Sequence, residues 1–169
     1  MAITLDGSNL TTVGVINSGT AVASTSGTSI DFTGIPAGVK RITVMLNAVS
    51  TNGTSILQVQ LGDSGGIETT GYNAVYFTNG AQAGYTTGFP LQFTGSAAFA
   101  LSGHLVLTLI DSSTNNWIGS GTIAGTASNN TCTSFAGQKA TSATLDRVRI
   151  TTTNGTDTFD AGSINILYE

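Results

Sequence analysis

The sequence has unusually few charged residues. They make up 8% of its 169 positions, against about 25% in an ordinary soluble domain. A chain this poor in Glu and Lys cannot build the charged wet faces of long surface helices. Only five residues are basic and the formal net charge is −4, so no basic stripe is available to neutralise phosphates. We therefore expect no nucleic-acid partner and no attraction to an anionic membrane surface.

Cysteine and long apolar runs are also scarce. Cys132 is the single cysteine, which excludes an intrachain disulfide and a cysteine-based zinc cage; we expect it to fill space in a strand. No apolar run reaches the roughly 18 residues that suggest a membrane span. The first residues, Met1 to Gly7, lack the basic region and apolar stretch of a secretory signal. We expect no membrane insertion.

Small polar residues and β-branched residues take the place of charge. Hydrophobic residues make up 40% of the chain, and 22 residues are glycine. Thr, Val and Ile fit a pleated sheet, whereas Gly, Ser and Asn fit the turns between strands. The length suits one domain with a single buried core.

The clearest strand signal is the alternation from Lys40 to Ser50. It predicts one face that carries Ile42, Val44, Leu46 and Ala48. Asn52-Gly53 follows, which is a strong signal for a tight hairpin. Residues 56–61 should then form the returning strand, with Leu57, Val59 and Leu61 inward and with Gln58 and Gln60 outward.

Weaker alternation along the rest of the chain predicts about ten strands and no helix. Short, regularly spaced strands indicate a sandwich or barrel. The length exceeds that of an immunoglobulin-like domain, so we expect an all-β fold: a jelly-roll-like antiparallel β-sandwich. It should occupy residues 27–169 as a single domain, after an N-terminal extension or arm at 1–26 that can contact a neighbouring subunit. The other expected strands are 28–33, 72–78, 87–94, 105–110, 117–123, 145–152 and 163–168, with 62–71 as a loop and 79–84 as a turn.

One short motif resembles a catalytic site. Gly62 to Gly66 reads Gly-Asp-Ser-Gly-Gly, as around the nucleophile of trypsin-like serine proteases. That mechanism needs a histidine to accept the serine proton and a carboxylate to orient it. Both precede the serine in that family, whereas the single histidine here, His104, follows Ser64. We interpret the motif as a turn and expect no catalytic residues and no enzyme.

The acidic residues suggest turn capping and ion pairing. Asp157 and Asp160 are three residues apart, which places them on opposite faces of an extended strand and not together as a glycosidase pair. A calcium site that uses Asp111, Asp157 or Asp160 is an alternative, although no EF-hand pattern supports it. Asp146 is expected to pair with Arg147 or Arg149. We expect no metal site and no cofactor.

Aromatic side chains are the candidates for ligand or interface contacts. Rings can stack on sugars, although burial in the core is the common alternative. The candidates are Tyr72, Tyr76, Phe77, Tyr85, Phe89 and Trp117.

Six segments of the chain share one further pattern: 28–36, 39–45, 49–53, 69–72, 145–151 and 155–165. Together they resemble a module found in virion proteins of tailed bacteriophages and prophages. The module commonly ends a longer, tail-fibre-like protein, and the resemblance covers Thr28 to Glu169. It implies no catalytic motif. Only residues 1–27 precede the module here, and this free-standing form is similar to a capsid decoration or cement protein.

The resemblance and the composition predict a non-enzymatic structural protein on the outer surface of a phage particle. Sheet edges need covering, which favours a homo-oligomer, either a trimer or a dimer. Its partners would be the major capsid protein or other virion proteins. The alternative is a tail-fibre or spike component that binds a host surface glycan or receptor. Copy number per particle discriminates the two, because decoration needs hundreds of copies.

Overall fold

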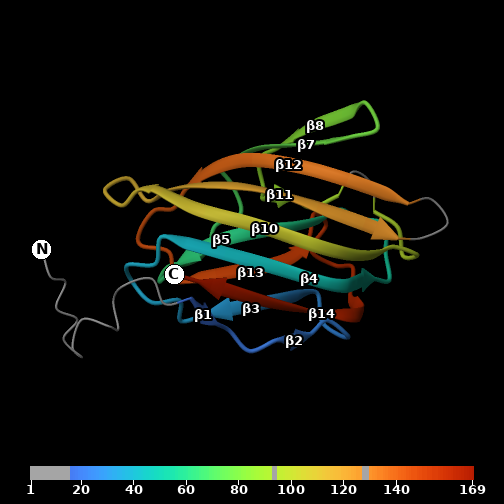
Figure 1. The fold of residues 1–169 in the computed structure, drawn as a ribbon, viewed down its shortest axis with the longest axis horizontal. Helices are drawn as coiled ribbons and strands as arrows, with labels where there is room; N and C mark the ends of the chain where they lie inside the picture. Colours follow the sequence, from blue (N-terminus) through green and yellow to red (C-terminus); the bar gives the residue numbers. More distant parts are fainter. Residues whose placement is uncertain (1–15, 93–94, 127–129) are drawn as a thin grey trace, which may run out of the picture.

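A computed structural model describes residues 16–92, 95–126 and 130–169. Every regular element in these residues is a strand, and the strands form two antiparallel sheets that face each other (Figure 1). This confirms the all-β class and is consistent with a β-sandwich. The described residues contain no helix that could cross a membrane.

The larger sheet has nine strands. Its order is β1-β14-β4-β10-β11-β12-β7-β8, and β2 also pairs with β14. The chain therefore places its last long strand beside one of its first. The bounds are β1 (Asn17–Ser18), β2 (Val22–Ala23), β4 (Arg41–Thr51), β7 (Asn73–Thr78), β8 (Ala81–Tyr85), β10 (Ala100–Asp111), β11 (Asn116–Thr126), β12 (Thr131–Ala140) and β14 (Phe159–Tyr168).

The smaller sheet has five strands in the order β3-β13-β5-β6, with β9 also paired to β5. Its inward side chains meet those of the larger sheet in a single core, which contains Ile42, Val44, Leu105, Val148 and Ile150. Each large aliphatic side chain buried there contributes about 1.5–3 kcal/mol. The bounds are β3 (Ser29–Thr33), β5 (Leu57–Asp63), β6 (Gly66–Ile67), β9 (Phe89–Pro90) and β13 (Arg147–Thr152).

The short strands before β3 pair with a strand of the same chain. β1 and β2 both pair with β14, and the hydroxyl of Ser24 donates to the carbonyl of Ala161 at 2.7 Å. The described part of the predicted extension at 1–26 thus covers the edge of the nine-stranded sheet. Residues 1–15 of that extension lie outside the described residues.

The hairpin expected at Asn52-Gly53 is wrong. β4 pairs with β10 and β14, whereas β5 pairs with β13 in the other sheet, so the chain crosses between sheets here. The backbone N–H of Asn52 instead donates to the carbonyl of Thr158, just before β14, at 2.9 Å. Tertiary pairing has overridden a local turn signal.

Two details of the β4 and β5 faces also differ from expectation. Ala48 has a φ of 51° at a bulge in β4, so it is exposed and Val49 takes the buried position. The side chains of Gln58 and Gln60 do lie on the face of β5 away from Leu57 and Val59, as expected. However, the two glutamines are only 2% and 5% exposed. They are covered because the segment before β9 folds over them.

The hairpin predicted between 105–110 and 117–123 is confirmed, in a longer form, as β10 and β11. The turn expected at 79–84 is wrong in part, because only Asn79 and Gly80 turn, both at positive φ, and β8 begins at Ala81.

Strand β12 was not expected. Phe135 is its one large apolar side chain in the core, and buried Thr133 and Lys139 lie on the same inward face.

Candidate interaction surface

The serine protease motif does not assemble a catalytic group. Ser64 is exposed in the turn between β5 and β6, at the five-stranded sheet. His104 is exposed on β10 of the other sheet, between Met45 and Thr122. The Asp63 carboxylate accepts hydrogen bonds from the N–H groups of Gly65 and Ala143, each at 2.8 Å. Asp63 therefore organises a turn and not a histidine.

The other carboxylates have local partners. Asp111 accepts bonds from Ser113 in the β10–β11 turn, and Asp157 accepts one from the Ser55 N–H at 2.9 Å. Hydrogen bonds from Ser113 and from Asn154 hold the pKa values of Asp111 and Asp157 below the ordinary range. Asp160 is exposed on β14. Within the described ranges, no three His, Cys, Asp or Glu residues gather where they could hold a metal ion.

The ion pairs lie mostly around the five-stranded sheet. Asp146 pairs with Arg147 at 2.6 Å, as expected. Arg149 pairs instead with Asp31 on the neighbouring strand, through two bonds of 2.7 Å. Both pairs are about one-third exposed, so each contributes little to stability.

A partly buried polar cluster joins the two sheets. Lys139 on β12 forms an ion pair with Glu68, which follows β6. The Ser142 hydroxyl donates to Asp63 at 2.7 Å and lies 2.9 Å from the Glu68 carboxylate. Hydrogen bonds from Ser142 and Gly65 lower the pKa of Asp63. Burial raises the pKa of Glu68, but the bonds from Lys139 and Ser142 outweigh it, so that pKa is also lowered. Each of these side chains has a hydrogen-bond or ion-pair partner within the cluster, which indicates a structural role. We call Lys139, Glu68, Ser142 and Asp63 the clamp.

The six candidate aromatics divide between core and surface. Tyr72, Tyr76, Phe89 and Trp117 are at most 6% exposed, so their rings are not available to a ligand on the described surface. The Tyr72 hydroxyl donates to the carbonyl of Glu68 at 2.9 Å, and burial raises its pKa. Tyr85 is half-buried and lies against Tyr76, with ring centroids 5.8 Å apart. Only Phe77, at 56%, presents an exposed ring.

Phe77 belongs to a broad surface that carries no formal charge. Strand pairing aligns outward side chains in two rows across the nine-stranded sheet, from β14 through β4, β10, β11 and β12 to β7. None of these residues is Asp, Glu, Lys or Arg, and we call them the uncharged face. The rows are Asn165, Met45, His104, Thr122, Ser134 and Phe77, and Leu167, Thr43, Val106, Ser120, Ala136 and Val75.

Exposed apolar side chains concentrate on the same sheet. Six large hydrophobic residues of the described chain are more than one-third exposed, and all six lie on strands of this sheet or next to one. Cys132, expected to fill space, is instead exposed on β12, two residues before Ser134. The six are Ile16, Val22, Val75, Phe77, Ile110 and Ile118.

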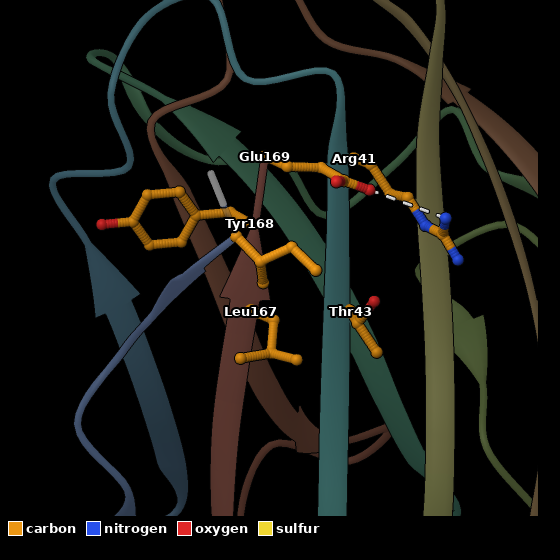
Figure 2. A pocket seen from close by; sticks show the side chains of 6 residues that line it. Arg41, Thr43, Leu167, Tyr168 and Glu169 are labelled. Atoms are coloured by element: carbon orange, nitrogen blue, oxygen red, sulfur yellow. Dashed lines mark ion pairs between the residues drawn. The ribbon is translucent and has the colours of Figure 1, made fainter. Parts of the chain in front are cut away.

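One corner of this surface is hollowed. A cavity of about 210 Å³ lies where the C-terminal end of β14 meets the start of β4. Figure 2 shows Thr43 and Leu167 side by side on these strands, with the ion pair between Arg41 and Glu169 above them. The Tyr168 ring extends sideways, away from Thr43 and Arg41 (Figure 2). Ile16 also lines the cavity and is 61% exposed.

The uncharged face is suited to contact with another protein surface. The centres of protein interfaces are depleted in charged residues, and a wide apolar and hydroxyl-bearing face can be covered without burying an unpaired charge. Sequence reasoning missed this surface because its rows combine residues from six strands, one of which, β12, was not expected. The available signal was the lack of charge at outward positions of the strands that were predicted.

Comparisons with protein-family models, with curated proteins and with solved structures found no match to this chain.

Proposed function

We propose that this chain is a non-enzymatic structural protein of a tailed-phage virion, a capsid decoration or cement protein that works as a homo-oligomer. The observation that carries the structural role is the uncharged face, which spans six strands without an Asp, Glu, Lys or Arg. The phage assignment is supported by the sequence segments that resemble the virion module.

A second copy of the chain is the occupant that this face fits best. In a symmetric contact the same patch meets itself, so a charge near the symmetry axis would meet a like charge. The two rows avoid that repulsion. Two partly exposed ion pairs, Asp31–Arg149 and Asp146–Arg147, lie on the five-stranded sheet, which is free to face outward. A third, Arg41–Glu169, lies at one corner of the nine-stranded sheet, beside the two rows and not within them.

The jelly-roll topology is part of the same proposal. Its support is the interleaved strand order, in which β14, β4 and β10 are neighbours in one sheet and β3, β13 and β5 are neighbours in the other. The chain changes sheet repeatedly, for example from β3 to β4, from β4 to β5 and from β13 to β14. Two facing sheets with such interleaving are typical of jelly rolls, which are common in viral capsids.

The test is the location and number of this chain in purified phage particles. Quantitative mass spectrometry against the major capsid protein gives the copy number, and a reconstruction of the particle gives the position. We expect hundreds of copies on the outer surface of the head. A few copies at the tail would overturn decoration in favour of the alternative, a tail-fibre or spike component, and absence from the particle would contradict both.

The alternative role has one observation of its own. The β7–β8 hairpin is the last pair at one end of the nine-stranded sheet and projects beyond the rest of the domain (Figure 1). It carries exposed Phe77 and Val75. A projecting, partly apolar hairpin suits contact with a receptor, and host-cell binding by the isolated protein tests this role directly.

A further inference from the structure

A second surface, on the opposite side of the molecule, has a different chemistry. A groove of about 500 Å³ lies over the outer face of the five-stranded sheet, a volume within the range of about 300–1,000 Å³ for small-ligand sites. We call it the threonine groove. Its lining residues are Thr28, Ser29, Gln58, Gln60, Thr69, Thr70, Thr87, Arg149, Thr151, Thr152, Thr153, Asn154 and Gly155.

Strand register builds the floor of the threonine groove. Thr151 on β13 pairs with Ser29 on β3 and with Gln58 on β5. Arg149 is the next outward residue of β13, beside Gln60. The floor is therefore a grid of hydroxyl, amide and guanidinium groups on three hydrogen-bonded strands, which is a rigid support for a binding site.

The amide side chains of the floor are fixed in orientation. The Thr87 hydroxyl donates to Oε1 of Gln58 at 2.9 Å, and Nε2 of Gln60 donates to the carbonyl of Thr87 at 2.8 Å. These two bonds use one polar atom of each amide. Both side chains are only 2% and 5% exposed, so they form a fixed base, and the exposed hydroxyls around them, such as those of Thr28 and Thr70, offer the donors and acceptors for a ligand.

The electrostatics of the groove favour a neutral ligand. Arg149 is its one charged lining residue, and Asp31 neutralises it through two bonds of 2.7 Å. An anionic ligand would compete with Asp31 for the guanidinium. The lining has no carboxylate and no large apolar side chain, so neither a cation nor an apolar peptide side chain finds a matching contact.

We infer that the threonine groove binds a neutral oligosaccharide. Hydroxyl groups on a sugar both donate and accept hydrogen bonds, which matches a lining of hydroxyls and amides that does the same. The groove lies on the sheet opposite the uncharged face, so the inference goes beyond the proposed structural role and does not depend on it. None of the aromatic residues that the sequence suggested lines this groove.

The test uses the full chain, labelled with a fluorophore, on an array of neutral, sialylated and sulfated oligosaccharides, followed by titration of the neutral hits. Thr70 is exposed at the rim, so Thr70→Trp fills the groove without changing the core. Thr114→Trp, at an exposed site in the β10–β11 turn, is the matched control. Circular dichroism verifies that both variants are folded.

We expect binding to neutral oligosaccharides, an at least tenfold loss of affinity in Thr70→Trp and no change in Thr114→Trp. The inference is overturned if no neutral oligosaccharide binds at concentrations up to about 10 mM. It is also overturned if only sialylated or sulfated glycans bind, or if Thr70→Trp binds as well as the unmodified chain. Each of these outcomes leaves the copy number in the particle, and hence the structural role, to be decided separately.

Discussion

Lys139 on β12 forms an ion pair with Glu68, which connects the nine-stranded sheet to the loop that follows β6 of the five-stranded sheet. The Lys139 side chain is 7% exposed and that of Glu68 is 21% exposed. Lys139 Nζ also donates to the carbonyl of Ala140 at 2.7 Å and lies 5.5 Å from the centroid of the Tyr72 ring. A lysine with these contacts is part of the core and not of the solvated surface.

Removal of this lysine should destabilise the fold strongly. In Lys139→Met, Glu68 keeps its partly buried charge without its cationic partner, so we expect the free energy of unfolding to fall by about 2–4 kcal/mol. Arg149→Met is the control, because its pair with Asp31 is one-third exposed and should be worth less than about 1 kcal/mol. Urea unfolding of both variants checks this; equal effects would contradict the clamp.

The clamp also predicts sensitivity to acid. The pKa values of Asp63 and Glu68 are lowered in the folded chain, so both carboxylates contribute stability above their unfolded pKa values of about 4. That contribution is lost as the pH falls through the lower folded values. We expect the melting temperature to fall steeply below about pH 4. Asp63→Asn should melt lower at pH 7 and depend less on pH in the acid range; parallel melting curves for the two proteins would refute the assignment.

Gly53 should tolerate no side chain. A β-carbon at this position would overlap Oδ2 of Asp157, which accepts the bond from the Ser55 N–H. Gly53→Ala must displace that carboxylate, and we expect a loss of about 2 kcal/mol or more. Gly84→Ala is the matched control, since its β-carbon would meet only one atom, at 3.9 Å. Thermal denaturation compares them, and a Gly53→Ala variant as stable as Gly84→Ala would disprove this contact.

The predictions from the alternation of apolar and polar residues are correct where a strand pairs with the next strand along the chain. The β10–β11 hairpin and the inward positions Ile164 and Ile166 of β14 follow from it. It failed at the crossing from β4 to β5, because the partners of those strands, β14 and β13, lie about a hundred residues further along the chain. No local pattern reports such a distant pairing.

The candidate surfaces were harder to predict than the strands. Gln58 and Gln60 were placed on the correct face, but the cover supplied by Thr87 is a tertiary contact. The uncharged face needed the register of six strands before its rows became visible. Four of the six candidate aromatics lie in the core, because large rings also fill cores, as Phe89 does at 0% exposure, whereas Phe77 is exposed on the uncharged face.

We propose that another copy of the chain covers the uncharged face, and two substitutions test this contact. Thr122 is exposed near the middle of that face, and Thr33 is an exposed threonine on the five-stranded sheet. A glutamate at position 122 would place like charges together in a symmetric contact, whereas one at position 33 would not. Thr122→Glu and Thr33→Glu therefore form a matched pair.

Sedimentation velocity of the three proteins, combined with the rate at which Cys132 reacts with a thiol reagent, is the most direct measurement. We predict that the unmodified chain and Thr33→Glu sediment as a dimer or trimer with a slowly reacting thiol. Thr122→Glu should sediment as a monomer whose thiol reacts rapidly. A monomeric unmodified chain with a freely reactive Cys132 at about 100 μM, where contacts of micromolar affinity would be occupied, would contradict the account.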